Sequence, residues 1–126
     1  MHIRLTSIMV DDQDRAETFY TEVLGFTRKT VIPMGVYRWL TVTDADGIVE
    51  LSLEPNANPA GKMFQDAMFA QKIPVVAFEV DDIHSECKRL KRLGVVFTRE
   101  PMKAGAVTLA IFADTCGNLV QIYQHT

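Results

Sequence analysis

Glu50 is the residue of this chain best suited to acid–base chemistry. It lies in the alternating segment Ile48–Leu53, between the apolar residues Val49 and Leu51. A carboxyl group in an apolar cavity has a raised pKa and can take a proton from a carbon next to a carbonyl group. The plainer alternative is a polar side chain on the solvent face of a strand, where most glutamates lie. Glu50 is therefore either a general base or a surface residue.

Three neighbouring residues, Tyr37, Arg38 and Trp39, could bind a ligand by stacking or by charge. An arginine holds anionic groups through paired hydrogen bonds, and aromatic rings stack on flat ligands. Aromatic residues on a strand also serve as core packing, so both interpretations stay open. Gln121, in the strand-like segment Leu119–Tyr123, offers an amide to the same kind of site.

The remaining reactive residue types are scattered along the sequence. The three histidines are His2, His84 and His125, and the two cysteines, Cys87 and Cys116, lie in unrelated contexts. A metal site needs ligands that converge on one point, and a disulfide framework needs a regular cysteine pattern. The sequence therefore predicts no metal site and no cofactor.

Composition limits the class of protein. The chain has 126 residues, of which 48% are hydrophobic and 23% charged, with a net charge of −3. These values are typical of one soluble globular domain and count against nucleic acid as the main partner. No apolar run reaches the ~20 residues of a membrane span, and the first residues do not resemble a signal peptide. A reducing cytoplasm is the expected location.

The candidate residues must be positioned by an alternating set of strands and helices. Residues 1–10 alternate like a strand, and an amphipathic helix follows from Asp11 to Gly25. A linker at 54–59 precedes a short helix at 60–71, with the expected apolar stripe Met63, Phe64, Ala67 and Met68. The other expected strands are 27–32, 37–43, 48–53, 75–80, 96–100, 107–112 and 119–123, with a further helix at 83–93.

The second half of the chain repeats the first. Val10-Asp11-Asp12 recurs as Val80-Asp81-Asp82, and Leu24-Gly25 recurs as Leu93-Gly94. Asp44 and Gly47 recur as Asp114 and Gly117, and Val49-Glu50-Leu51 parallels Val120-Gln121-Ile122. The offset between the two copies is nearly the same in every match, which indicates a tandem repeat of one βαβββ unit.

The predicted fold class is therefore α+β, with two tandem βαβββ modules that form a curved eight-stranded mixed sheet. Residues 1–126 make one domain, with module 1 at about 1–54, the linker and its helix at about 55–74, and module 2 at about 75–126. Each module covers one face of its sheet with a helix and leaves the other face bare. Two bare faces placed together enclose a cup, where a ligand pocket is expected.

Two motifs resemble a known family. Val10-Asp11-Asp12, Ala16, Phe19-Tyr20 and Val23 to Phe26 are similar to the opening motif of the vicinal oxygen chelate superfamily, the glyoxalase, bleomycin-resistance and dioxygenase type. Asp114, Gly117 and Asn118 resemble its closing D-x-x-G-N turn. The resemblance covers nearly the whole chain and implies the glyoxalase-like fold. It does not imply one activity, because this scaffold hosts isomerases, dioxygenases, epimerases and binding proteins.

The resemblance also implies where a metal would bind in this family. The four ligand positions fall on Leu5 and Glu50 in the first module and on Val75 and Gln121 in the second. Leu5 and Val75 have no donor atom, and one carboxylate with one neutral amide makes a poor site for a divalent metal. Met9 stands where glyoxalase I usually has an arginine that holds glutathione. The resemblance therefore implies a degenerate metal site.

Two functions are consistent with this sequence. In the first, the chain binds a small, largely apolar or aromatic molecule without chemistry. The expected pocket residues are then Leu5, Met9, Trp39, Val75, Phe112 and Tyr123, with Glu50 and Gln121 to orient the ligand. In the second, a lyase or isomerase acts on a small carbonyl substrate, with Glu50 as the base and with Arg38 or Gln121 to stabilise the enolate.

A homodimer is expected in either case. Uncovered sheet edges and the apolar stripe of the linker helix, which includes Met63 and Phe64, need covering. No nucleic acid or membrane partner is expected.

Overall fold

The computed structural model describes residues 1–126 and confirms two tandem βαβββ modules. Module 1 contains β1 (Leu5–Val10), α1 (Gln13–Thr18), the π-helical turn η1 (Phe19–Val23), β2 (Thr27–Met34), β3 (Tyr37–Thr43) and β4 (Glu50–Pro55). Module 2 contains β5 (Val76–Glu79), α3 (Ile83–Arg92), β6 (Phe97–Ala104), β7 (Val107–Ala113) and β8 (Leu119–His125). Helix α2 (Pro59–Ala70) connects them.

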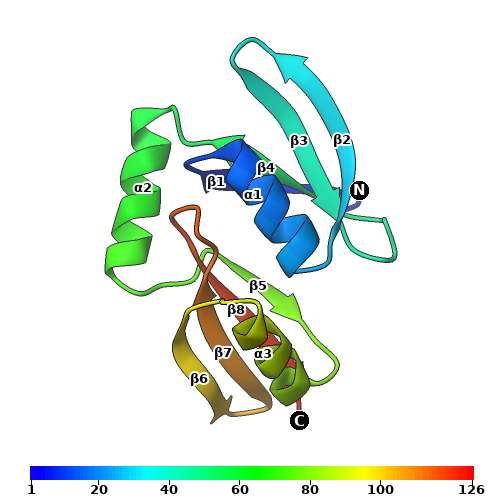
Figure 1. Cartoon of the computed structure of the whole chain (residues 1–126), viewed down its shortest axis with the longest axis vertical. Helices are drawn as coiled ribbons and strands as arrows, with labels where there is room; N and C mark the ends of the chain where they lie inside the picture. Colours follow the sequence, from blue (N-terminus) through cyan, green and yellow to red (C-terminus); the bar gives the residue numbers. More distant parts are fainter.

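The strands form one four-stranded mixed sheet in each module. Their orders are β1-β4-β3-β2 and β5-β8-β7-β6, so the first strand of each module pairs in parallel with the last. The sequence predicted one curved eight-stranded sheet, whereas here β1 and β5 are not joined by a ladder. Figure 1 shows α1 across the first sheet, α3 across the second, and α2 standing beside both modules. No helix of the chain is long and apolar enough to cross a lipid bilayer.

Capping residues mark where the helices begin and end. The carboxylates of Asp12 and Asp82 accept hydrogen bonds from the backbone N–H of Arg15 at 3.0 Å and of Ser85 at 3.1 Å. Such N-caps satisfy backbone donors that the first helical turn leaves free. Gly25 follows the π-helical turn η1, which continues α1, and Gly94 follows α3, with φ of +88° and +86°. This left-handed conformation suits glycine and ends both helices.

Strand alternation places the core between the sheets and the helices. On the first sheet Ile8, Val10, Leu40, Val42, Leu51 and Leu53 are all buried and belong to one core cluster with residues of α1. From module 2 the same cluster includes Ile83, Cys87 and Leu90 of α3. The rings of Phe19 and Phe112 lie 6.2 Å apart, which joins the two modules through their helix-covered faces. The opposite face of each sheet is left outside this core.

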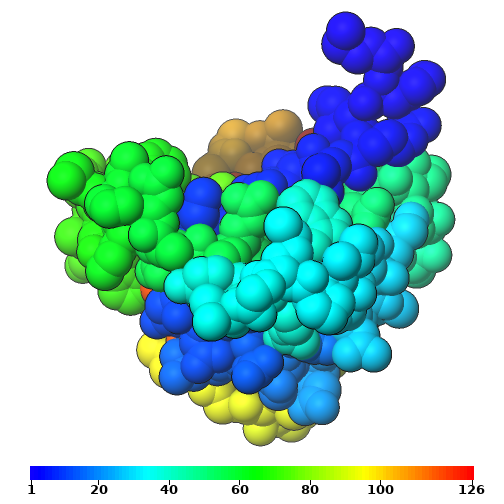
Figure 2. Space-filling view, turned by 90° about the horizontal axis from the view of Figure 1, so that it is seen from above, coloured from blue at the N-terminus to red at the C-terminus, as the bar shows by residue number.

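The linker helix α2 packs differently from the sequence expectation. Its buried residue is Gln65, at 2% exposure, whereas Met63 and Phe64 of the expected stripe are 72% and 59% exposed. Gln65 is buried because it satisfies polar groups of both modules. Its Nε2 donates to the carbonyl oxygens of Met9 at 3.1 Å and Cys116 at 2.9 Å. Figure 2 shows α2 as a lobe on one side of the molecule, with the first residues of the chain projecting on the other.

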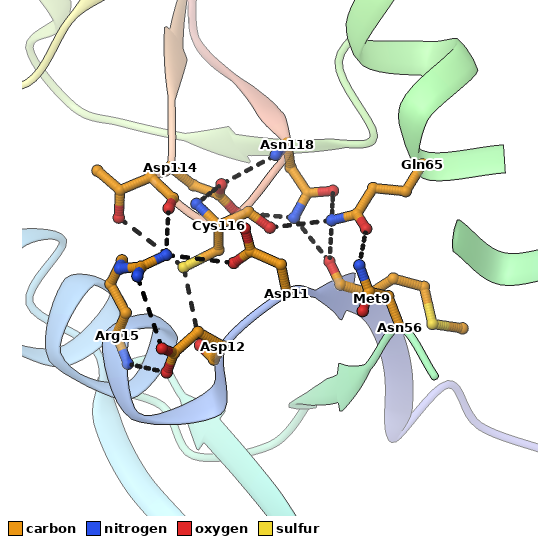
Figure 3. Close-up of polar contacts among 10 residues, drawn as sticks. Met9, Asp11, Asp12, Arg15, Asn56, Gln65, Asp114, Cys116 and Asn118 are labelled. Carbon is orange, nitrogen blue, oxygen red and sulfur yellow. Dashed lines mark hydrogen bonds and ion pairs between the residues drawn. The ribbon is translucent and has the colours of Figure 1, made fainter. Parts of the chain in front are cut away.

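A buried polar junction fixes the two modules and α2 together (Figure 3). The carboxylate of Asp114 accepts from the Tyr20 hydroxyl at 2.7 Å, from the backbone N–H of Cys116 at 2.7 Å and of Asn118 at 3.0 Å, and from the Asn118 side chain at 2.8 Å. Buried polar groups are tolerated when they are fully paired. The D-x-x-G-N turn is therefore the structural link between the modules.

Gly117 should be the glycine least tolerant of substitution. It has φ of +96°, and a Cβ placed there would lie 2.7 Å from Nε2 of the hydrogen-bonded Gln65. We expect Gly117→Ala to lower the free energy of unfolding by about 2–4 kcal/mol, through backbone strain and a displaced hydrogen bond. Gly47→Ala is the matched control, because Gly47 has φ of +68° with nothing within 4 Å. If Gly117→Ala and Gly47→Ala lower the free energy of unfolding equally in urea denaturation, the contact with Gln65 contributes nothing to the loss.

Candidate functional site

The first sheet has an open face on the side opposite α1, and this face is the candidate site. We define the open face by six residues that share that side of the four strands: Ser7, Thr30, Trp39, Thr41, Glu50 and Ser52. Residues opposite one another in a ladder point to the same side of a sheet. The face has an apolar border that includes Leu5 and Ile32, which are 48% and 53% exposed.

Glu50 lies on the open face, but its electrostatic environment differs from the expected one. One carboxylate oxygen, Oε1, accepts hydrogen bonds from the Thr41 hydroxyl at 2.7 Å and the Thr30 hydroxyl at 3.0 Å. These bonds, and to a smaller extent the charge of Lys29, lower the pKa of Glu50. The expectation of a pKa raised by desolvation is therefore wrong, because neighbouring strands supply hydroxyl donors. A carboxylate stabilised in this way is a weaker base.

This environment predicts how Glu50 affects stability at different pH values. A lowered folded-state pKa stabilises the wild-type protein above the unfolded value of ~4.3, and this contribution disappears as the pH falls through the folded value. Glu50→Gln should therefore be less stable than wild type at pH 7, with the difference shrinking toward pH 3. Thermal unfolding of both proteins between pH 3 and 8 measures this. A variant more stable than wild type at pH 7 would restore the desolvated-carboxylate interpretation.

Trp39 lies in a cavity at one end of the open face. The cavity has a volume of about 310 Å³ and is lined by Met34, Tyr37, Arg38, Trp39, Ser52, Glu54 and Pro55. Aromatic and thioether groups here offer flat, polarisable surfaces, and Glu54 adds a carboxylate. Trp39 lies on the side of β3 that faces away from the core, and its role as a ligand-stacking residue stays a prediction.

Arg38 points to the other side of the same strand. Its guanidinium pairs with Asp14 and Glu17 of α1, at 2.9 Å each, and Gln13 bonds to its backbone. Two carboxylates already neutralise its charge, so this arginine fastens α1 to β3. The structure does not bring Arg38 to Glu50, contrary to the expected pairing of an anion-binding group with the base.

Two more of the expected residues, Met9 of module 1 and Val75 of module 2, border a second cavity. Met9 and Val75 line a space of about 360 Å³ between β1 and α2, together with Ser7 and Phe64. Met9 packs under α2, where its Sδ is 3.4 Å from the position that a Cβ on Gly61 would take. Leu5 lies farther along β1 in the row of Glu50 and is half exposed.

The expected residues of module 2 fall on two different surfaces. Gln121 and Tyr123 are partly exposed on the second sheet, opposite Ala77 and Glu79 of β5. Phe112 is fully buried, with its ring between Phe19 and Phe97. It lies on the helix-covered face, because strand β7 points its even-numbered side chains toward the core. Phe112 therefore stabilises the core and cannot line a ligand pocket in this chain.

The ladders also correct the repeat alignment near Gln121. Thr41 and Ser7 both lie opposite Ser52 in module 1, and Ile111 and Ala77 both lie opposite Gln121 in module 2. Gln121 is therefore the counterpart of Ser52, two residues along the strand from Glu50. The turn of module 1 contains one more residue than the turn of module 2, which shifts the strands after it.

The side chains do not fit the metal that the family resemblance implies. Leu5, opposite Glu50, and Ala77, opposite Gln121, have no donor atoms. No group of three or more histidine, cysteine, aspartate or glutamate side chains is arranged to hold a metal ion. Divalent metals in proteins need several converging donors, so we derive no chemistry through a metal here.

A third cavity lies at the seam between the modules. Its volume is about 210 Å³, and Thr6, Phe26, Val42, Leu51, Val76 and Phe78 are among its lining residues. Most of these residues lie on the helix-covered faces, and the rings of Phe26 and Phe78 are 5.0 Å apart. This cavity offers apolar packing but little polar recognition, so the open face remains the better candidate.

Known proteins share the whole architecture. Residues 2–122 match the family model described as Glyoxalase/Bleomycin resistance protein/Dioxygenase superfamily. An uncharacterized Bacillus subtilis protein, YurT, is 54% identical over 98% of this chain and 99% of its own. The Haemophilus influenzae lactoylglutathione lyase is 27% identical over 99% of this chain and 93% of its own. The structure of TnmS3, an antibiotic binding protein from Streptomyces sp. CB03234, is 27% identical with a TM-score of 0.81, covering 100% of this chain and 97% of that one.

Proposed function

The chain belongs to the Glyoxalase/Bleomycin resistance protein/Dioxygenase superfamily, and from this premise we propose that it binds a small, largely apolar or aromatic molecule on the open face. The observation that carries the proposal is the cavity beside Trp39. The aromatic residues Tyr37 and Trp39 line it with Met34, and Ser52 and Glu54 add polar groups. Such a mixture of apolar walls with few polar groups is typical of small-molecule sites. The likeness to an antibiotic binding protein supports the same function.

The alternative is a lyase or isomerase with Glu50 as general base, which the likeness to lactoylglutathione lyases suggests. The geometry supports this alternative less well. Hydrogen bonds from Thr41 and Thr30 lower the pKa of Glu50, and Arg38 is committed to α1. The carboxylate would then be a weak base. The cation whose charge reaches it, Lys29, lowers its pKa further and already donates to the carbonyl oxygen of Gly47 at 2.8 Å.

Native mass spectrometry of the protein purified from its own host tests the proposal. We expect an added small-molecule mass on the wild-type chain that is lost in Trp39→Ala and kept in the control Phe69→Ala, an exposed aromatic residue of α2. Chemical conversion of a panel of hemithioacetals, diols and acyl-CoA thioesters, lost in Glu50→Ala, would instead establish the enzyme.

We also propose that the protein is a homodimer. Ile32, Met34 and Val36, on the hairpin of β2 and β3, are all exposed, as are Met63 and Phe64 of α2. Contiguous exposed apolar groups mark interaction surfaces. Within one chain Trp39 and Tyr123 lie on different sheets, so a second chain is what would bring another sheet over the open face.

Light scattering checks the dimer. At micromolar concentration the mass should be twice the 14.2 kDa of one chain. Met34→Glu should shift the measured mass toward that of one chain, because an unpaired carboxylate destabilises an apolar interface. Val96→Glu, at an exposed apolar residue of module 2 outside this surface, is the matched control. A wild-type monomer would contradict the dimer.

A further inference from the structure

One buried polar atom on the open face has no partner. The side chain of Ser52 is buried, with the residue 1% exposed, and its Oγ is the one buried side-chain nitrogen or oxygen in the protein without a hydrogen bond. Leaving a buried polar group unpaired costs about 1–3 kcal/mol, so such groups are rare and call for an explanation. Ser52 lines the cavity beside Trp39, so the unpaired hydroxyl belongs to the candidate site.

Ser52 sits within a row of hydroxyl groups that crosses all four strands. The ladders pair Thr30 with Thr41, Thr41 with Ser52, and Ser52 with Ser7. Three of the four hydroxyl protons are already committed. Thr30 and Thr41 donate to Glu50 at 3.0 and 2.7 Å, and Ser7 donates to Glu54 at 3.2 Å. Ser52 therefore carries the one uncommitted hydroxyl proton of the row.

The charges around this row select against an anionic ligand. Glu50 and Glu54 flank Ser52 on the same strand, two residues to either side. Glu54 makes no ion pair, and Arg38 is held by Asp14 and Glu17 on the far side of the sheet. The charge of Lys29 reaches Glu50, but its ammonium donates to the carbonyl oxygen of Gly47 at 2.8 Å. A carboxylate ligand would therefore meet two like charges against one cation, and the excess negative charge costs affinity in a partly buried site.

From this arrangement we propose that Ser52 donates a hydrogen bond to a carbonyl oxygen of a neutral aromatic ligand that stacks on Trp39. This inference rests on the proposed binding function and specifies its ligand class. Tyr37 and Trp39 supply flat aromatic walls and Met34 a thioether, and Ser52 and Glu54 line the same cavity. Binding requires that Trp39 or Glu54 rotate to admit the ligand oxygen, because the hydroxyl is buried in the free protein. The hydroxyl has no hydrogen-bond partner in the free protein, so a hydrogen bond to the ligand forms without breaking one inside the protein.

Two matched probes test the hydrogen bond. 1-Acetonaphthone carries the carbonyl, and 1-isopropenylnaphthalene has the same shape with a methylene in place of the oxygen. Trp39 is the only tryptophan of the chain, so quenching of intrinsic fluorescence reports on this cavity directly. We expect the ketone to bind wild type about 3- to 10-fold more tightly than the hydrocarbon, which corresponds to one neutral hydrogen bond. The anion 1-naphthoate should bind more weakly than the ketone.

Two variants test the role of Ser52. Ser52→Ala should abolish the preference for the ketone, and Ser85→Ala, which removes a hydroxyl of α3 committed to Asp82, should keep it. In the free protein Ser52→Ala should melt at or above the wild-type temperature, because no internal hydrogen bond is lost. A lower melting temperature would overturn the inference by showing that the hydroxyl has a partner within the protein.

The outcomes distinguish this inference from the proposed function. Equal affinity of ketone and hydrocarbon for wild type, with quenching by both, would overturn the role of Ser52 and leave binding at Trp39 intact. A preference that survives Ser52→Ala would do the same. No quenching by any of the probes would refute both the aromatic binding site and the role of Ser52.

Discussion

Asp114→Asn should lower the free energy of unfolding by about 2–4 kcal/mol. Asp114 is fully buried, and its two oxygens accept four hydrogen bonds. An asparagine keeps the shape but turns one oxygen into an NH₂ group. In one orientation of the amide, its NH₂ group faces the Tyr20 hydroxyl and the Asn118 side chain, which both donate in the wild type. In the other orientation it faces the backbone N–H groups of the turn. Breaking a buried network in this way leaves several polar groups unpaired, and each costs about 1–3 kcal/mol.

The chain provides a matched control for this prediction. Asp44 occupies the same place in the first repeat, but it is exposed and accepts one hydrogen bond, from the backbone N–H of Gly47 at 3.2 Å. Asp44→Asn should change stability by less than about 0.5 kcal/mol. In a Tyr20→Phe background Asp114→Asn should cost less than it does alone, because the two share a bond. Equal small losses at Asp114 and Asp44 in urea denaturation would contradict the account of the junction.

The same network makes an ionised Tyr20 unfavourable in the folded state. Burial, and next the charge of Asp114, raise the pKa of Tyr20 well above its ordinary value. The hydroxyl thus stays protonated and continues to donate to Asp114. Since the unfolded chain loses this proton near pH 10 and the folded one does not, stability is expected to fall as the pH rises above 10.

Trp39→Ala should reduce the affinity for 1-acetonaphthone by about 10- to 100-fold. Truncating a tryptophan in a ligand cavity removes both stacking and buried apolar area. Trp39→Phe keeps an aromatic surface and should lose less affinity for the ketone. Phe69→Ala, at an exposed residue of α2, should keep the wild-type affinity. Equilibrium dialysis measures all four proteins without relying on tryptophan fluorescence. Unchanged affinity in Trp39→Ala would remove the open face as the binding site.

The repeat and its turns were sufficient to predict the architecture, because they report on local structure. Gly25 and Gly94 end helices through their left-handed conformation, and Asp12 and Asp82 begin them, in both copies. These features need only neighbouring residues. The division into two separate sheets depends on how the modules pack, which short-range patterns do not encode.

The candidate site was harder to predict because it depends on which strands become neighbours. The pKa of Glu50 is set by Thr41 and Thr30, which reach it only through the ladders of β3 with β4 and β2. The role of Gln65 could not be predicted because it lies among apolar residues of α2 in the sequence and its polar partners belong to both modules. Ser52 did have a sequence signal, since it lies two residues from Glu50 on the same face of a strand.

Nuclear magnetic resonance of the ¹⁵N-labelled protein titrated with 1-acetonaphthone tests the central claim most directly, since it reports on every cavity at once. The account predicts shifts of the single indole N–H of Trp39 and of the backbone amides of Ser52 and Glu54. The amide resonances of Phe26 and Phe78, at the seam between the modules, should not shift. Shifts confined to that seam, with the Trp39 indole unmoved, would contradict the assignment of the ligand site to the open face.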